Sequence, residues 1–275
     1  MARRMFLILL TVSVVVVLLL GTLTLFQRRL IYLTGSGQVP PPAADVLPGA
    51  SEWQLQTEDG LGLAAWFVAA ESPRPDGMTV LVAPGNAGNR ADRAPLARAL
   101  GDAGFDVLLV DYRGYGGNPG SPTETGLGLD VRAGYDALRL HDVPADRILL
   151  FGESIGAAVV TALATDVPAA GLVLRSPFVD LASVAADAYP LLPVRWLLWD
   201  DYPLLDRISE VRVPVAVVYG TADSIVDPQQ SVRVAEAAPV SAGTFTVVGA
   251  DHNDSALGYG RQVIAAVRGV AAAQR

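Results

Sequence analysis

Residues 147–164 read RILLFGESIGAAVVTALA. The apolar run before the first glycine predicts a strand buried on both faces, and the small residues after the serine predict a helix packed close to it. Between them, GESIG at 152–156 matches G-x-S-x-G in the strand–turn–helix context of a nucleophile elbow. Gly152 and Gly156 would allow a close approach, and the turn would lift the Ser154 hydroxyl above the sheet edge. The simpler alternative is a tight turn whose serine only caps the helix.

Short apolar segments with few charges recur on either side of this turn. Two alternating runs separated by Glu-Asp-Gly predict a β-hairpin, and further apolar runs alternate with helical patterns. The predicted strands are 53–57, 61–68, 79–83, 107–110, 148–151, 172–174, 215–219 and 244–248. One helix is expected to begin at Ser121 as its N-cap, with Glu124 as the reciprocal capping partner. The alternation predicts an α/β fold with a doubly wound, mostly parallel sheet.

Residues 178–210 interrupt this alternation and separate two strands by more than thirty residues. They include the apolar sequence YPLLPVRWLLWDDYPLL. A long connector in an α/β unit is often a lid or cap over a site, so we predict a short helical cap insertion. The alternative is a helical excursion packed on the sheet. The whole body is expected to span residues 51–275.

The amino terminus is a different kind of segment. Residues 5–26 carry no charge, and at about 1.5 Å per residue a helix of this length would cross a hydrocarbon core of about 30 Å. We therefore predict a single-pass membrane anchor within residues 1–33, and a Gly- and Pro-rich linker at 34–50 that lifts the body off the membrane. A cleaved signal peptide is the alternative, although its apolar region would be shorter. Two arginines flank each end, and the free amine favours a cytoplasmic amino terminus with an extracytoplasmic body.

Charge and composition exclude several classes of function. The chain has 20 basic residues, all arginine, against 28 acidic ones, and a net charge of −8. An acidic body is not expected to bind nucleic acid. Without lysine there is no P-loop or Schiff-base chemistry, and without cysteine there is no thiol nucleophile or Cys-ligated metal. With two histidines and no HExxH-like spacing, we expect neither a metal nor another cofactor.

A serine hydroxyl needs a base to act as a nucleophile. In the chain order Ser–acid–His that accompanies such an elbow, the base lies downstream, and His252 is the one histidine there. It follows the last predicted strand, so its loop can reach the elbow; a plain surface histidine is the alternative. His141 precedes Ser154 in a turn-like segment and is interpreted as a solvated residue at a helix end.

The acid of such a site is sought in the loop that contains Asp223 and Asp227. Asp227 precedes Pro228 and resembles a helix N-cap in a capping box, which would explain it structurally. Asp223 lies just past a predicted strand and has no such local explanation, so it is favoured. Asp251 adjoins His252 and is badly placed to orient the ring of its neighbour.

A developing oxyanion needs hydrogen-bond donors near the nucleophile. The backbone N–H of Ile155, directly after the serine, is one expected donor. The loop PGNAGN at 84–89 follows an earlier strand, and its glycines would let the backbone approach a substrate. We assign the second donor to Asn86. An ordinary glycine-rich turn is the alternative.

In this order the segments resemble the α/β-hydrolase superfamily, and in particular membrane-anchored serine hydrolases with an HGNAGN-like turn. The matching sequences are PGNAGN (84–89), DYRGYGGNPGSP (111–122), GESIG (152–156), GTADSIVDP (220–228) and ADHND (250–254). The resemblance implies an eight-stranded sheet with helices on both faces and a cap after the sixth strand. It also implies a catalytic triad and two oxyanion donors, which map to Ser154, Asp223, His252, Asn86 and Ile155. Pro84 departs from the family, which usually has a loop-supporting histidine there.

These residues predict a serine hydrolase of carboxylic esters or thioesters that acts through an acyl-enzyme. The anchor and the apolar stretch 189–199 favour small-molecule or lipid-like, membrane-proximal acyl substrates. A serine peptidase or amidase on the same fold is one alternative. A non-catalytic, membrane-tethered binding domain is another, because a fold alone does not prove activity. Dehalogenase chemistry is disfavoured, because such enzymes normally have aspartate at the elbow.

Overall fold

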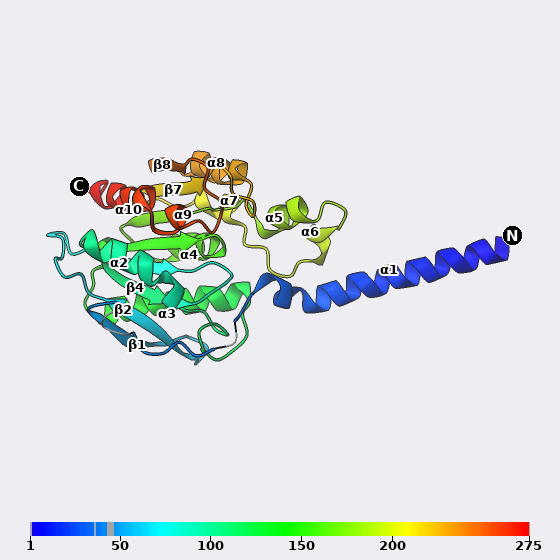
Figure 1. Ribbon diagram of the computed structural model, residues 1–275, viewed down its shortest axis with the longest axis horizontal. Helices are drawn as coiled ribbons and strands as arrows, with labels where there is room; N and C mark the ends of the chain where they lie inside the picture. Colours follow the sequence, from blue (N-terminus) through cyan, green and yellow to red (C-terminus); the bar gives the residue numbers. More distant parts are fainter. Residues whose placement is uncertain (1, 36, 43–46, 275) are drawn as a thin grey trace.

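A computed structural model describes residues 2–35, 37–42 and 47–274 of the chain. The apolar runs pair into one eight-stranded sheet with the order β1-β2-β4-β3-β5-β6-β7-β8 (Figure 1). The strands are β1 (Ala50–Gln56), β2 (Gly62–Val68), β3 (Thr79–Ala83), β4 (Asp106–Val110), β5 (Ile148–Glu153), β6 (Gly171–Arg175), β7 (Val215–Gly220) and β8 (Ser241–Val247). β2 runs antiparallel to β1 and β4, and the other neighbours are parallel. The predicted hairpin and mostly parallel sheet are both confirmed.

Helices cover both faces of the sheet. Alternate side chains of a strand point to opposite faces, and in β5 Leu150 packs in one apolar core while Leu149 and Phe151 pack in the other. The first core includes residues of α3 (Glu124–Leu140), α4 (Ile155–Asp166), α7 (Leu204–Ile208) and α8 (Pro228–Ala237). The second includes residues of α2 (Ala94–Asp102), α9 (Ser255–Tyr259) and α10 (Arg261–Ala272). The doubly wound architecture is therefore confirmed; η1 (Arg90–Arg93) and η2 (Ala145–Arg147) are short 3₁₀ helices.

This topology gathers the candidate residues at one edge. β3, β5, β6, β7 and β8 are parallel, so the loops that leave their carboxyl ends meet on the same side of the sheet. The loop with Asn86 follows β3, Ser154 follows β5, Asp223 follows β7 and His252 follows β8. The topology therefore brings these four residues, which are far apart in the sequence, to one edge of the sheet.

The start of α3 corrects one expectation. Thr123, not Ser121, is the N-cap: its backbone is extended and its hydroxyl accepts a hydrogen bond from the Gly126 N–H. Glu124 does not return to the cap, because its carboxylate instead accepts hydrogen bonds from the backbone N–H groups of Asp201 and Tyr202. A tertiary contact between Glu124 and the segment that joins β6 to β7 thus takes the place of the predicted capping hydrogen bond.

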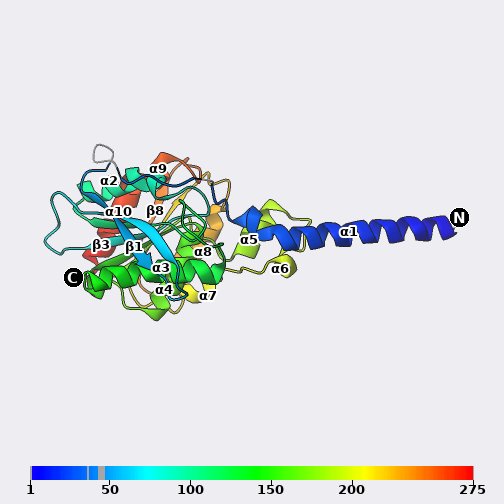
Figure 2. The same ribbon diagram turned by 90° about the horizontal axis from the view of Figure 1, so that it is seen from below.

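The segment predicted as a cap lies between β6 and β7 and contains α5 (Leu181–Ala188), α6 (Val194–Leu197) and α7. α5 and α6 project from the body (Figures 1 and 2), whereas α7 packs on α4 with Leu204 and Ile208 fully buried. The predicted cap and its alternative, a helical excursion packed on the sheet, thus each describe a part of residues 178–210. The first part protrudes, and the last part belongs to the packed helical layer.

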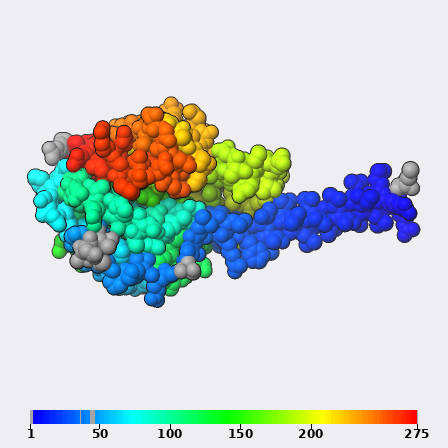
Figure 3. Space-filling view, in the orientation of Figure 1, coloured from blue at the N-terminus to red at the C-terminus, as the bar shows by residue number. Residues whose placement is uncertain are grey.

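α1 (Ala2–Ile31) is longer than the helix predicted at 5–26 and extends away from the body (Figures 1 and 3). By length and composition it can cross a membrane, a test that a signal sequence also passes. Its last turn does not stand off from the body, because Gln27 and the following Tyr32 are buried against it. The predicted linker at 34–50 lies partly outside the described residues. Its described part runs along the body, with Val39 bonded to Gly116 and Leu47 buried, rather than lifting the body away.

Candidate active site

The turn after β5 has the strained geometry of a nucleophile elbow. Ser154 has φ 52° and ψ −113°, a conformation that L-residues rarely adopt, and α4 begins at the next residue. Its backbone N–H donates to the carbonyl oxygen of Arg175 on the neighbouring strand, at 2.8 Å. A Cβ on Gly152 would lie 2.5 Å from Ala157 Cα, and one on Gly156 would lie 2.3 Å from the Ala83 carbonyl oxygen. Both glycines are therefore required by the close approach of strand, turn and helix.

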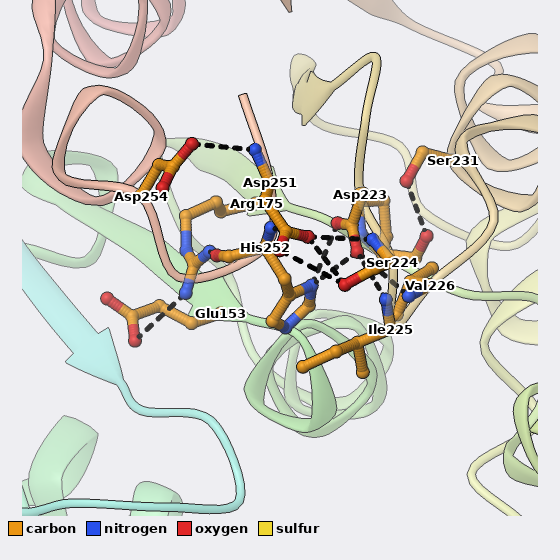
Figure 4. Close-up of polar contacts among 11 residues, drawn as sticks. Glu153, Arg175, Asp223, Ser224, Ile225, Val226, Ser231, Asp251, His252 and Asp254 are labelled. Atoms are coloured by element: carbon orange, nitrogen blue, oxygen red, sulfur yellow. Dashed lines mark hydrogen bonds and ion pairs between the residues drawn. The ribbon is translucent and has the colours of Figure 1, made fainter. Parts of the chain in front are cut away.

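The imidazole and one carboxylate of the candidate site form a buried pair (Figure 4). His252 Nδ1 lies 2.9 and 2.8 Å from the two carboxylate oxygens of Asp223. The two residues are 5% and 7% exposed. This contact fixes the ring and leaves Nε2 as the nitrogen available for proton exchange.

The surroundings of Asp223 favour its ionised form. Burial acts to raise its pKa, but the hydrogen bond and charge interaction with His252, together with the Val226 amide, hold the pKa below its ordinary value. Its Oδ1 accepts the backbone N–H groups of Ile225 at 3.1 Å and Val226 at 2.9 Å. Asp223 thus also has a local turn-forming role, which the sequence analysis did not assign to it.

The other acids of these two loops have different partners. Asp227 caps α8 through the Gln229 N–H at 2.8 Å, as expected, although the side chain of Gln230 bonds to Asp187 instead of closing a capping box. Asp251 accepts the backbone N–H and hydroxyl of Ser224 and so ties the loop after β7 to the loop after β8.

His141, the second histidine, ends α3 and packs on strand β1. It is the exposed C-cap of α3, and its ring stacks on Trp53 with 4.0 Å between the ring centres. It is therefore the solvated helix-end residue that the sequence predicted.

Arg175 at the end of β6 was missed by the sequence analysis. Its Nη1 donates to the carbonyl oxygen of His252 at 2.7 Å, and its Nη2 lies 3.7 Å from the carboxylate of Glu153 (Figure 4). Glu153 is the residue before the nucleophile and also accepts from Arg93 at 3.1 Å. Burial favours protonation of Glu153, but the two arginines hold its pKa below the ordinary value. This ionic cluster links Glu153, the residue beside Ser154, to the backbone of His252. In the sequence, the one sign of such a cluster was the charge of Glu153 inside the G-x-S-x-G motif.

The loop after β3 lies against the elbow. A Cβ on Gly85 would be 3.8 Å from the Ser154 Cβ. Within the described residues, neither the Asn86 nor the Ile155 backbone N–H donates a hydrogen bond to the protein. Pro84, in the place of the family histidine, is held through its carbonyl oxygen by the Tyr112 hydroxyl at 2.9 Å.

The carbonyl oxygen and the side-chain NH₂ group of Asn86 are both engaged. Its carbonyl oxygen accepts the Tyr115 hydroxyl at 2.9 Å and the Leu33 N–H at 3.0 Å. Its side-chain amide donates to the Ile31 carbonyl oxygen at 2.9 Å. The loop is thus attached to the end of α1, while the backbone N–H of Asn86 makes no hydrogen bond within the described residues.

The structure brings Asp223 and His252 into contact and places Ser154, Asn86 and Ile155 at the same sheet edge. In the described part of the chain, the Ser154 hydroxyl makes no hydrogen bond to the His252 ring. Catalytic hydrogen bonds often tighten only when a substrate is bound. Across the described residues, no group of three His, Cys, Asp or Glu side chains is arranged to hold a metal ion.

Comparison with known proteins places this fold in a family. The Hydrolase_4 family model, described as serine aminopeptidase S33, matches residues 74–199. An uncharacterized protein of Mycobacterium tuberculosis is 46% identical over 261 residues, which are 94% of this chain and 92% of that protein. The α/β-hydrolase domain-containing protein WAV2 of Arabidopsis thaliana is 30% identical over 236 residues, covering 78% of this chain and 76% of its own. The chain belongs to the α/β-hydrolase family.

A solved structure shares this α/β-hydrolase fold. An esterase of Pyrococcus furiosus superposes with a TM-score of 0.69 at 21% identity, covering 86% of this chain and 97% of the esterase. At that identity the likeness establishes the fold and leaves the substrate open. Membership of the α/β-hydrolase family supports a hydrolase activity for this chain.

Proposed function

We propose that this α/β-hydrolase is a membrane-anchored serine hydrolase of carboxylic esters or thioesters, with Ser154 as nucleophile and His252 as base. The observation that carries the proposal is the buried contact of 2.8 Å between His252 Nδ1 and Asp223, on the edge where Ser154 stands in a strained turn. A domain that only binds a partner has no need for a buried imidazole–carboxylate pair beside a strained serine. A non-catalytic role is therefore the weaker reading.

The chemistry follows from these positions. His252 Nε2 takes the proton of Ser154 as its oxygen attacks the substrate carbonyl carbon, and Asp223 stabilises the imidazolium that forms. The backbone N–H groups of Asn86 and Ile155 receive the oxyanion, aided by the amino terminus of α4. His252 then gives its proton to the leaving alcohol or thiol. Water, deprotonated by the same imidazole, releases the acyl group and restores Ser154.

The amino-terminal helix supports a membrane location. The uncharged part of α1 projects from the body with its apolar side chains exposed, and Arg3, Arg4, Arg28 and Arg29 flank it. We infer that α1 stays in the chain as a single-pass anchor, with the body outside the cytoplasm as the charge balance favours. Acyl substrates in or near the membrane are the class that this location brings to the site.

Activity-based labelling of the full chain tests the nucleophile. A fluorophosphonate probe should label wild type at Ser154, and labelling should disappear in Ser154→Ala and fall strongly in His252→Ala. Ser255→Ala and His141→Ala are matched controls, since both residues are exposed and, among the described residues, neither side chain hydrogen-bonds to Asp223 or His252. Ester turnover should fall by about 10⁴-fold or more in Ser154→Ala. Unlabelled but folded wild-type protein would favour the binding-domain reading instead.

Substrate class needs a separate comparison. The match to a model described as serine aminopeptidase S33 keeps peptidase or amidase activity as a second candidate. A series of p-nitrophenyl esters and acyl thioesters of increasing chain length should be hydrolysed in preference to aminoacyl p-nitroanilides. The reverse order of kcat/KM would replace the esterase proposal with the peptidase one.

A further inference from the structure

The protruding part of the cap carries large apolar side chains that the protein does not cover. Tyr189 is 60% exposed, Leu191 96%, Trp196 90% and Trp199 53%. These residues, here called the cap tip, fall within eleven consecutive positions. A soluble surface rarely exposes so many large apolar groups together unless another apolar phase meets them.

The cap tip lies at a defined level along α1. Gln27 accepts the Trp199 backbone N–H at 2.8 Å and donates to the Leu197 carbonyl oxygen at 2.8 Å. The Arg28 guanidinium lies 5.4 Å from the centre of the Trp199 ring. Phe26 is the last residue of the apolar run 5–26, so the cap tip is beside the helix where its apolar part ends.

That level is the edge of the hydrocarbon layer if α1 spans a membrane. Arginines flanking an apolar helix remain with the headgroups, and tryptophan and tyrosine concentrate at the same depth. In Figure 3 the projecting part of the cap lies beside the part of α1 that is next to the body, away from the amino-terminal end of the helix. The cap tip therefore has the composition and the position of a membrane-interface surface.

Several hydrogen bonds attach the cap to the end of α1 and to the residue that follows it. Asp200, directly after Trp199, accepts two hydrogen bonds from Arg28 at 3.0 Å and one from the Tyr32 hydroxyl at 2.9 Å. Tyr32 also bonds to Tyr202 at 2.8 Å, and Tyr32, Asp200 and Tyr202 are all buried. Movement of the cap away from α1 would break all four of these hydrogen bonds.

We propose that the cap tip lies in the interface of the same bilayer that α1 crosses, so that the hydrolase body rests on the membrane. The occupant of the cap tip is a lipid bilayer. Because Asn86 bonds to Ile31 and Leu33, the sheet edge that carries Ser154 faces this bilayer. This inference rests on the anchor in the proposed function and is independent of the proposed hydrolysis.

Tryptophan quenching by brominated lipid tests the inference. The full chain is reconstituted in phosphatidylcholine–phosphatidylglycerol vesicles with and without lipid brominated near the headgroup end of its chains. α1 contains no tryptophan, and Trp53 and Trp66 lie in the body strands, so quenching reports on the cap tip. With two of the four tryptophans at the interface, emission should fall by roughly half.

Two variants make the result specific. Trp196→Phe/Trp199→Phe removes the reporters and should abolish most of the quenching, whereas Trp53→Phe, the matched control, should retain it. Undiminished quenching in the double variant, or the absence of quenching in wild type, would overturn the inference.

Carbonate extraction of the same vesicles distinguishes a failure of the cap contact from a failure of the anchor. A chain that stays in the membrane but is not quenched refutes only the cap contact, whereas a chain that is extracted refutes the anchor as well. Fluorophosphonate labelling tests the proposed hydrolase activity independently of both.

Discussion

The side-chain amide of Asn86 donates a hydrogen bond to the carbonyl oxygen of Ile31, with 2.9 Å between the two atoms. Ile31 is the last residue of α1, so its carbonyl has no partner within the helix. The Leu33 N–H returns to the Asn86 carbonyl oxygen at 3.0 Å. The apolar amino-terminal helix and the loop that faces Ser154 are thus joined directly, without an intervening spacer.

This contact predicts a catalytic effect from a side chain that does no chemistry itself. In Asn86→Ala the backbone N–H remains, but the loop loses its bond to Ile31. We expect kcat to fall between about tenfold and a hundredfold, since a donor displaced by a fraction of an ångström serves the transition state poorly. KM should change little. Steady-state kinetics of the full chain on a p-nitrophenyl ester provide the measurement.

Asn86→Asp is the matched variant for this prediction. It preserves the size of the side chain but turns an oxygen toward the Ile31 carbonyl, so the loss in kcat should equal or exceed that of the alanine variant. Wild-type kcat in both variants would show that the bond to α1 does not position the loop.

Two aspartates four positions apart provide a test of the acid. In Asp223→Asn, an amide replaces the carboxylate that meets His252 Nδ1, so it neither fixes the tautomer nor stabilises the imidazolium. kcat should fall by about 10⁴-fold. In Asp227→Asn activity should be unchanged, because asparagine caps α8 as well as aspartate does. Ester hydrolysis by both variants measures this, and equal losses would argue against a special role for Asp223.

The parts of the fold and site that were predicted correctly are those that local sequence patterns and composition indicate. The β5–α4 turn was recognisable because continuous apolar residues, a five-residue motif and small helix residues all agree there. His252 was identifiable because the chain has two histidines and one follows the last strand. The capping assignment at Ser121 was wrong, because Thr123 caps α3 instead. Glu124 is not the capping partner, because it accepts a hydrogen bond from the backbone N–H of Asp201, 77 positions away, which no local pattern reveals.

The contacts that sequence reasoning missed are likewise long-range and polar. Tyr32 meets Asp200 across 168 positions, and Arg175 meets His252 across 77. Neither arginine nor tyrosine at a helix or strand end is unusual by itself. Only the folded chain shows that one pair attaches the amino-terminal helix and that the other supports the loop of the base.

The attachment of α1 should depend on pH through Asp200. Burial raises the pKa of Asp200, but hydrogen bonds from Arg28 and Tyr32 outweigh it and lower the pKa below its ordinary value of 3.8. A carboxylate with a lowered folded pKa stabilises the protein above its ordinary pKa, and this contribution is lost as pH falls through the folded value. Wild type should therefore be more thermostable than Asp200→Asn by an amount that is constant between about pH 5 and 7 and shrinks below about pH 4. Thermal unfolding in micelles across this range measures the difference, and a gap that widens on acidification would contradict the assignment.

Two glycines in helices of the body should respond oppositely to the same substitution. Gly156 lies in the first turn of α4, where a Cβ would stand 2.3 Å from the Ala83 carbonyl oxygen and 2.5 Å from that of Pro84. Because both are backbone atoms and cannot rotate away, Gly156→Ala should lower the free energy of unfolding by about 1–3 kcal/mol. Gly128 in α3 has no atom within 4 Å of such a Cβ, so Gly128→Ala should raise it by roughly 0.5–1 kcal/mol through helix propensity alone. Urea unfolding followed by circular dichroism distinguishes the two signs. A stabilising Gly156→Ala would mean that the elbow is not held by the backbone contact between α4 and the end of β3.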